Sequence, residues 1–356
     1  MAIGGSNETL EVCRFPQSKY VDAVRWLPKI SALERFAVVA LSDFDSGASS
    51  IDVLALDRSE LSTPSLQSSW TAPSRVSSLR TSESFRGPVI AASTLAGSVH
   101  FLFANSADAS LESEVCVSDK AFHAGAVSCV DLKDGGSECL SVGEDGRINL
   151  VNVGDTAKVS YRRVFDSNGL VSYTAAKWAS PVEFATGGLG FSLQWWDQRK
   201  PGGAACQLKG DWFKGASSGM VHSVDIHSSR KDICLAGGSS GVVFAWDLRR
   251  PQQSIILSQS ELNENESHLP CESEVWSVQY DSYFPSSRAM ATPSAHILPA
   301  MICSEDGILA VIRQGEEPVE LLAETCAINS FDIDKQNPSD VICGLEWESI
   351  AILSRP

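Results

Sequence analysis

The 356-residue chain is 43% hydrophobic and 20% charged. This composition buries a sizeable core and excludes a disordered chain, and by length alone it would fill two or three domains. Its 28 Lys and Arg against 44 Asp and Glu give a net charge of −16 without a concentrated basic patch, so we expect no direct nucleic-acid partner and no anionic membrane surface.

The chain begins without a targeting signal. Residues 1–10 contain no basic region followed by an apolar one, so the sequence predicts no secretory signal peptide. No uninterrupted apolar stretch reaches the ~18 residues that a spanning helix needs, so we expect no membrane insertion. The first strand-like run is Thr9–Phe15 (TLEVCRF).

After this run, one six-residue pattern recurs along the whole chain, with starts 46 to 55 residues apart. Positions four and six are mostly apolar, so the pattern has a period of two, which is typical of a strand with two unlike faces. The seven copies are VDAVRW from Val21, VSSLRT from Val76, VSCVDL from Val127, YTAAKW from Tyr173, VHSVDI from Val221, VWSVQY from Val275 and INSFDI from Ile328.

Two positions of this hexamer have a fixed character. The third residue is always small, namely Ala23, Ser78, Cys129, Ala175, Ser223, Ser277 and Ser330. The fifth residue is always polar, namely Arg25, Arg80, Asp131, Lys177, Asp225, Gln279 and Asp332.

An apolar run, a tight turn and a second apolar run follow each hexamer. The clearest copies are residues 139–153 (CLSVGEDGRINLVNV), 233–248 (ICLAGGSSGVVFAWDL) and 300–312 (AMICSEDGILAVI). Asp-Gly and Ser-Gly between β-rich runs indicate hairpins, because those turn positions favour positive φ. Each repeat therefore contains at least three antiparallel strands.

Seven such repeats of about 50 residues indicate an all-β, seven-bladed β-propeller that occupies residues 1–356 as one domain. The hexamer strand would lie nearest the axis, where neighbouring backbones crowd and exclude large third residues. The β-branched runs and Gly turns leave no room for helical repeats. The last repeat supplies only three strands, so we predict that residues 9–15 complete the last blade as its outer strand and leave no unpaired edge.

The repeats of this chain resemble those of the WD40 family. The resemblance rests on the seven hexamers, on WWDQR (Trp195–Arg199) and AWDLR (Ala245–Arg249) at third-strand ends, and on EDG at Glu144–Gly146 and Glu305–Gly307. The Trp-Asp ending is missing from five repeats, and the family's Gly-His dipeptide survives only as His123. In WD40 blades a His and a turn Asp can share a hydrogen-bond network with a strand Ser. The resemblance therefore implies a buried structural network of His123, Ser141 and Asp145, and structural turns at Asp145, Gly146, Asp306 and Gly307.

Three segments depart from the repeat and are predicted to be surface loops. They are the Ser/Pro-rich residues 57–74, the acidic residues 258–274 and residues 281–299. Each is interpreted as a solvated loop, with partner contact or phosphorylation at Thr63-Pro64 and Thr292-Pro293 as the alternative.

No catalytic signature is present. The sequence lacks GxSxG, P-loop, GxGxxG and HExxH motifs, and His222 and His227 are poorly spaced for joint metal binding. The ten cysteines lack CxxC spacing, and several sit in apolar strands, which indicates reduced, buried thiols. We therefore expect a non-enzymatic protein with no catalytic residue, cofactor or metal site.

The two WDxR copies permit a second hypothesis. Tandem copies resemble the docking box by which some WD40 proteins attach to the adaptor of a cullin ubiquitin ligase. On that hypothesis Asp197, Arg199, Asp247 and Arg249 would dock the adaptor, and the protein would be a substrate receptor. The simpler interpretation is that Trp-Asp ends a third strand and that Asp and Arg stabilise the turn.

The third-repeat turn SVGEDGRINLVNV (Ser141–Val153) is also similar to that of the WD-repeat nucleoporins of the Y-shaped outer-ring complex. This resemblance implies a non-enzymatic scaffold of the nuclear pore complex at the nuclear envelope. Its partners would be the α-helical solenoid nucleoporin of the short arm and other Y-complex subunits. It would support pore assembly, mRNA transport and protein transport.

Overall fold

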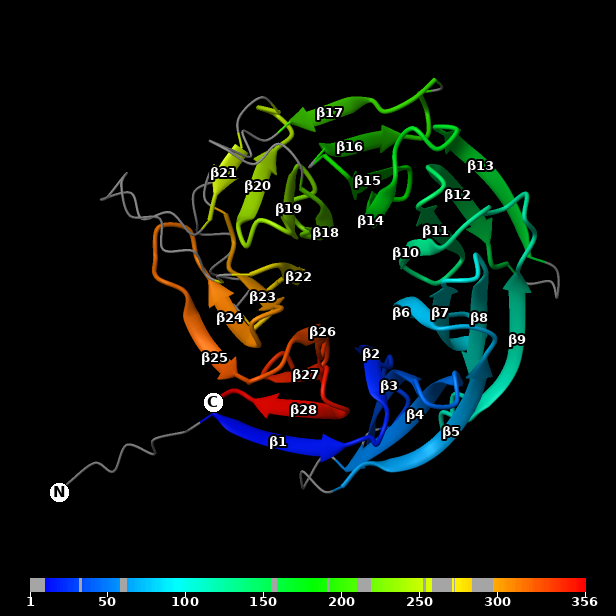
Figure 1. Ribbon diagram of the computed structural model, residues 1–356, viewed down its shortest axis with the longest axis vertical. Coiled ribbons are helices and arrows are strands. Elements are labelled where there is room, and N and C mark those ends of the chain that lie inside the picture. The colour runs from blue at the N-terminus through cyan, green and yellow to red at the C-terminus, as the bar shows by residue number, and fades with distance from the viewer. Residues whose placement is uncertain are drawn as a thin grey trace.

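The computed structural model describes residues 10–31, 34–57, 63–154, 159–190, 192–200, 202–209, 219–251, 254–257, 271, 273–283 and 297–356. This part of the chain forms strands and turns without any helix, so it holds no helix that could span a membrane. Its strands make seven four-stranded sheets arranged as blades around a central axis (Figure 1). The predicted seven-bladed all-β propeller is therefore confirmed.

Blades one to six each run from an inner to an outer strand in chain order. Blade one is β2 (Tyr20–Trp26), β3 (Glu34–Ser42), β4 (Ser49–Asp57) and β5 (Ser65–Ala72); blade two is β6 (Val76–Ser84), β7 (Gly87–Thr94), β8 (Val99–Ala104) and β9 (Leu111–Val117). Blade three is β10 (Val127–Leu132), β11 (Glu138–Gly143), β12 (Arg147–Asn152) and β13 (Ser160–Asp166); blade four is β14 (Tyr173–Ser180), β15 (Glu183–Gly188), β16 (Ser192–Asp197) and β17 (Cys206–Lys209). Blade five is β18 (Val221–Ile226), β19 (Ile233–Gly238), β20 (Val243–Asp247) and β21 (Ser254–Ile256); blade six is β22 (Val275–Tyr280), β23 (Ala300–Ser304), β24 (Ile308–Ile312) and β25 (Val319–Ala323). Blade seven is β26 (Ile328–Ile333), β27 (Asp340–Leu345), β28 (Ser349–Ser354) and, as its outer strand, β1 (Glu11–Pro16).

The seven hexamers form the innermost strands and encircle the axis (Figure 1). Crowding is severe there. A Cβ on Gly187 of β15 would lie 2.5 Å from a Val221 methyl of the next blade, and one on Gly237 of β19 would lie 2.7 Å from a Val275 methyl. Each glycine thus admits the first hexamer residue of the following blade.

Polar hexamer positions bond several of the inner strands to the next. Third-position serines accept backbone N–H groups from the following blade, with Val130 donating to Ser78 at 3.3 Å, Val278 to Ser223 at 3.1 Å and Val24 to Ser330 at 3.2 Å. Fifth-position carboxylates do the same, with Trp178 donating to Asp131 at 2.8 Å, Tyr280 to Asp225 at 2.7 Å and Trp26 to Asp332 at 2.8 Å. The hexamer is therefore an inter-blade joint as well as a strand.

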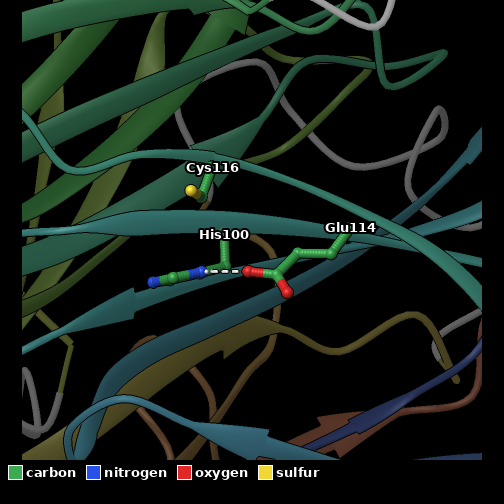
Figure 2. A group of neighbouring side chains, drawn as sticks. All are labelled: His100, Glu114 and Cys116. Atoms are coloured by element: carbon green, nitrogen blue, oxygen red, sulfur yellow. Dashed lines mark hydrogen bonds and ion pairs between the residues drawn. The ribbon is translucent and has the colours of Figure 1, made fainter.

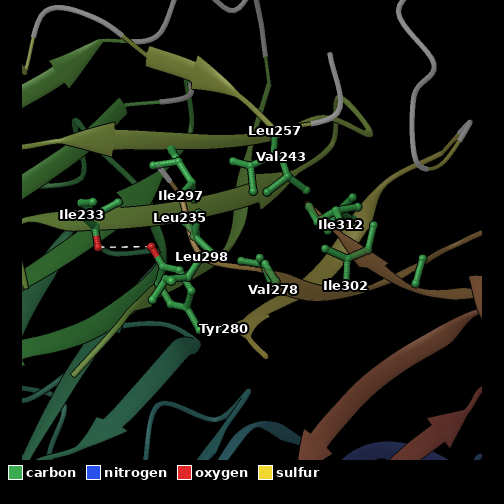
Figure 3. Packing of buried hydrophobic residues seen from close by; sticks show 14 of the residues in the cluster. Ile233, Leu235, Val243, Leu257, Val278, Tyr280, Ile297, Leu298, Ile302 and Ile312 are labelled. Atoms are coloured by element: carbon green, nitrogen blue, oxygen red, sulfur yellow. Dashed lines mark hydrogen bonds between the residues drawn. The ribbon is translucent and has the colours of Figure 1, made fainter. Parts of the chain in front are cut away.

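Apolar side chains fill the spaces between blades. Figure 3 shows the layer between blades five and six, where Ile233, Leu235 and Val243 face Val278 and Ile302. Tyr280 lies in the same layer, and its ring is almost fully buried. Burial of this kind, at roughly 25 cal/mol per Å² of apolar surface, is the main force that holds one blade against the next.

The N-terminal strand closes the ring. β1 pairs antiparallel with β28 from Glu11–Ser354 to Pro16–Ser349, so the chain's first and last strands lie side by side (Figure 1). Phe15 and Val12 pack against the apolar clusters of the closing blade. The predicted outer strand is confirmed, shifted by one to two residues from the predicted range.

Buried ion pairs fasten blade seven on both sides. Arg35 of β3 contacts Asp340 of β27, and both side chains are at least 91% buried. Arg355, just past β28, binds Asp281 of blade six through two bonds of 2.8 and 3.0 Å. A buried pair is costly to break because the remaining charge stays desolvated. These pairs therefore hold the closing blade in place.

One predicted loop is wrong. Residues 57–74 contain β5 (Ser65–Ala72), the outer strand of blade one, which pairs with β4 from Ala55–Ser65 to Ser49–Ala72. Its Ser-rich sequence suits a strand that faces solvent on the rim, where polar residues replace apolar ones. Most of residues 258–274 and 281–299, including Thr292, lie outside the described residues, as do His268 and His296.

Deleting residues 1–16 is expected to lower the thermal midpoint by about 10 °C, because it exposes the β28 edge and the apolar side chains that β1 covers. The control is deletion of residues 1–8, which leaves β1 intact. Calorimetry of the two truncated proteins checks this. An equal midpoint in both would contradict closure by β1.

Asp225→Ala is expected to lower the free energy of unfolding by about 3 kcal/mol, because the Tyr280 N–H and the Lys177 ammonium lose a buried partner. Gln279→Ala removes a side chain from the equivalent position of the next blade and is expected to cost less than about 1 kcal/mol. Urea denaturation measures both. Equal losses would show that the fifth-position carboxylate is not an inter-blade joint.

Candidate functional site

The turns between the second and third strands of every blade lie on one face of the disc, which we call the turn face. In blades two to seven, each such turn bonds to the segment that leads into its own inner strand. The backbone N–H groups of Leu95, Glu144, Leu189, Ser239, Glu305 and Glu346 donate to the carbonyls of Arg75, Ala126, Ser172, Met220, Glu274 and Ala327 at 2.9 to 3.2 Å. The turn face therefore carries the turns between second and third strands and the segments that lead into the inner strands. The turns between first and second strands, and between third and fourth strands, lie on the opposite face.

His123 is the centre of a buried network on the turn face. Its Nδ1 lies 3.0 Å from Asp145 Oδ1, and its Nε2 lies 3.0 Å from Ser141 Oγ. Asn149 Nδ2 approaches the same Nε2 at 3.0 Å, and the Ala124 N–H donates to Asp145 Oδ2 at 2.8 Å. The structure thus brings together the three residues that the WD40 resemblance indicated, and adds Asn149.

The ionisation of Asp145 follows from these contacts. Burial raises the pKa of this carboxyl, but hydrogen bonds from His123 and from the Ala124 and Arg147 N–H groups outweigh burial, so the net pKa is lowered. The His123 side chain is fully buried. An imidazole enclosed in this way has no access to a substrate, so the network acts on the blade's rigidity.

The structural turns predicted at Gly146 and Gly307 have a steric basis. Both glycines have left-handed φ, 74° and 81°. A Cβ on Gly146 would lie 2.4 Å from the Val171 carbonyl oxygen, and one on Gly307 would lie 2.3 Å from that of Glu324. Asp306 stands in the Asp145 position of blade six, where it accepts the Ser304 hydroxyl.

A second network, in blade two, was not predicted. His100 of β8 lies between Ser98, 2.8 Å from Nε2, and Glu114 of β9, 2.7 Å from Nδ1 (Figure 2). The Trp70 indole of blade one donates to the other Glu114 oxygen at 2.9 Å. In the sequence the network is marked only by one His in a predicted strand. The residues that bond to each other there, among them Glu114 of β9 and Trp70 of blade one, are brought together by the fold.

His100, Glu114 and Cys116 are close enough to hold a metal ion (Figure 2). Their other contacts favour a structural role. Both His100 nitrogens and both Glu114 oxygens already have partners, so an ion held by these side chains would have to replace hydrogen bonds of the network. The pKa of the Cys116 thiol is raised by burial and by Glu114, which disfavours the thiolate that metals bind.

Most of the cysteines lie in the core. All ten are free, and the six buried ones are Cys129, Cys139, Cys234, Cys271, Cys303 and Cys343. Burial raises the pKa of Cys234 to about 12 and that of Cys271 to about 11. Such thiols stay protonated and serve as small apolar side chains.

The two WDxR boxes have the same internal geometry. In each, the Arg Nε contacts the Asp Oδ1, at 2.8 Å for Arg199–Asp197 and 2.7 Å for Arg249–Asp247. A second guanidinium nitrogen contacts the other carboxylate oxygen at 3.0 and 2.6 Å. These hydrogen bonds lower the pKa of both carboxyls. Each Arg therefore closes its own turn in a bidentate pair, and its guanidinium stays half or more exposed.

A β-propeller with seven four-stranded blades, a His-Ser-Asp network and Trp-Asp strand ends is a WD40-type protein. No protein-family model matches the chain. It is 56% identical to the nuclear pore complex protein NUP43 of Arabidopsis thaliana over 361 residues, covering 98% of this chain and 99% of that protein. It is 28% identical to nucleoporin Nup43 of Mus musculus and 27% identical to that of Homo sapiens over 184 residues, 51% of this chain and 40% of each relative. The chain belongs to the Nup43 family.

Asp145→Asn is expected to lower the free energy of unfolding by about 1–3 kcal/mol at neutral pH, because the charge-assisted bonds to His123 and Ala124 are lost. The folded pKa lies below the ordinary 3.8, so the carboxylate's contribution is complete above that value and is lost as the pH falls through the folded pKa. The difference between the proteins should therefore be constant from about pH 7 to 5 and narrow below about pH 4. Asp134→Asn, at an exposed position in the turn between β10 and β11, is the control. A pH-independent difference down to the lowest pH measured would contradict this account.

Proposed function

We propose that the protein is a non-enzymatic scaffold subunit of the Y-shaped outer-ring subcomplex of the nuclear pore complex. The observation that carries this proposal is 56% identity to a nuclear pore complex protein over nearly the full length of both chains. Family membership supports the nuclear envelope as its location. Its contribution to pore assembly, mRNA transport and protein transport is then the indirect one of a structural subunit.

The internal bonding of the disc supports a scaffold mechanism. Serines, aspartates and buried ion pairs join successive blades, so the loops project from a stiff ring. The polar groups that could carry chemistry, His123, His100 and the buried cysteines, are occupied by hydrogen bonds or enclosed in the core. What remains for function is the outer surface, which acts through shape and charge complementarity.

We assign to this surface protein partners, namely the α-helical solenoid nucleoporin of the short arm and other Y-complex subunits. The acidic composition supports protein contacts over direct nucleic-acid binding. We propose that residues 1–356 act as one domain, since closure by β1 makes both ends of the described chain part of one blade. The ligase-receptor hypothesis gains no specific support, because each WDxR arginine is paired with its own aspartate.

Affinity purification from nuclei, read by mass spectrometry, tests the proposed function. The wild-type protein and the Arg199→Ala plus Arg249→Ala double variant are both expected to recover outer-ring nucleoporins at equal levels. Recovery of the cullin-ligase adaptor without nucleoporins, lost in the double variant, would overturn the scaffold proposal in favour of the receptor.

A further inference from the structure

Exposed apolar side chains gather on the turn face. Among the described residues, nine large hydrophobic side chains are exposed. Five of them lie on second-to-third strand turns or on the loop into an inner strand, namely Phe44, Leu95, Leu170, Leu189 and Trp347. Of the other four described side chains, Phe85 and Tyr283 lie on the opposite face, and Leu66 and Val319 lie on the outer strands β5 and β25. Exposed apolar groups that share one face mark a surface for a protein partner.

The two aromatic members of this set lie together across the seam where blade seven meets blade one. Phe44 and Trp347, each 66% exposed, line one hollow of about 450 Å³ with Tyr20, Glu346 and Glu348. The Tyr20 ring is part of the lining and lies 5.2 Å from Phe44 in an edge-to-face contact. Asn329 of blade seven donates to the Tyr20 hydroxyl at 3.0 Å, which fixes this ring across the seam.

Acidic residues flank both aromatics. Phe44 stands between Asp43 and Asp45, and Trp347 between Glu346 and Glu348. The Arg75 guanidinium is already committed, since it pairs with Asp22 at 2.7 Å and stacks on Tyr20 at 4.8 Å and on Phe44 at 5.1 Å. Lys19 is the cation that acts on Asp43. The hollow therefore offers the Trp347 ring and the part of Phe44 that Arg75 leaves uncovered, inside a rim that carries more carboxylates than cations.

The turn that carries Trp347 differs from the equivalent turns of the other blades in its backbone conformation. Glu348 has a left-handed φ of 55°, at the position where the equivalent turns have Gly97, Gly146, Gly241 and Gly307. A non-glycine residue there costs on the order of 1–2 kcal/mol. Blade seven thus carries a strained acidic residue where a glycine would be more stable, beside an exposed tryptophan. Backbone strain of this kind is concentrated at functional sites, which directs attention to this turn.

We propose that this hollow, which we call the seam pocket (Tyr20, Phe44, Glu346, Trp347 and Glu348), docks a basic amphipathic segment of a partner protein. A large apolar side chain of that segment enters between Phe44 and Trp347. Flanking Lys or Arg residues pair with the rim carboxylates and stack over Trp347. The inference rests on the proposed function, because it names the surface through which the scaffold holds one of its subunits.

Other occupants fit less well. Phe44 and Trp347 leave the hollow too open to enclose the 70–90% of a small ligand that pockets usually bury. A second copy, related by a two-fold axis, would bring the same acidic rim against itself. An anionic membrane would meet the same repulsion.

Photo-crosslinking tests the occupant. The full chain with Trp347 replaced by p-benzoylphenylalanine is irradiated in isolated nuclear envelopes, and the crosslinked peptide is sequenced. We expect a segment with a large apolar residue and Lys or Arg within about one helical turn of it. A crosslinked segment that is acidic, or is from this chain itself, or the absence of any crosslink, would overturn the proposal.

Matched variants give the second measurement. Phe44→Ala plus Trp347→Ala, and separately Glu346→Lys plus Glu348→Lys, are each expected to reduce recovery of the crosslinked partner about tenfold or more. The controls sit on the opposite face, Phe85→Ala for the apolar change and Glu316→Lys plus Glu317→Lys for the charge change, and should leave recovery unchanged. Thermal midpoints within about 2 °C of wild type show that the variants are folded.

Failure of this inference is distinguishable from failure of the proposed function. If the wild-type protein recovers outer-ring nucleoporins and the seam-pocket variants recover them equally, the scaffold stands and the seam pocket is not its docking surface. If the variants lose a partner that is no nucleoporin, the docking surface stands and the nuclear pore assignment fails.

Discussion

The ring depends on bonds between neighbouring inner strands. A hexamer strand near the axis carries backbone N–H groups that face the preceding blade, and an unsatisfied buried donor costs on the order of 1–3 kcal/mol. Serine at position three and aspartate at position five supply the acceptors. The buried carboxylates in turn need cations, and Lys177 serves both Asp131 and Asp225 at 4.0 and 3.2 Å. Burial lowers the pKa of Lys177, but attraction to the two carboxylates outweighs it, so the net pKa is raised and the ammonium stays charged.

Closure of the ring depends on blade seven. Ring geometry lets each blade bury two faces, but only if the last blade reaches the first. β1 removes the open edge of β28, Arg35 ties blade one to Asp340, and Arg355 ties blade seven to Asp281. Strand pairing and buried ion pairs thus act at the same blade. Loss of the β1–β28 pairing would leave an unpaired strand edge at blade seven, and loss of one partner of an ion pair would leave a desolvated charge there. Closure of the ring therefore needs both kinds of interaction.

The inner ring could be predicted from the sequence, because burial forces a strict pattern on the hexamers, and its closure followed from the missing fourth strand of the last repeat. The other outer strands could not be predicted. β5 and β13 bury almost no side chain, so hydrophobicity does not mark them, and a Ser-rich strand such as Ser65–Ala72 resembles a loop. The His123 network followed from a family pattern within one blade. The His100 network needs Trp70 from another blade, and the seam pocket joins Phe44 to Trp347 from opposite ends of the chain, so both required the fold.

The net negative charge of the chain does not come from the fifth hexamer positions. Arg25, Arg80 and Lys177 balance Asp131, Asp225 and Asp332 at the fifth positions, so the axial ring is neutral and the net −16 lies elsewhere. The residues that hold the ring face inward, whereas turn tips such as Phe44 and Trp347 are mostly exposed. Exposed tips of this kind can change with little effect on the inter-blade joints, unlike Asp145, which belongs to a buried network, and the strained Glu348 costs only local energy. Because the exposed turn tips contribute little to the stability of the ring, one face of the disc can present residues suited to a partner. In this chain those residues are the aromatic and acidic side chains at the seam between blades seven and one.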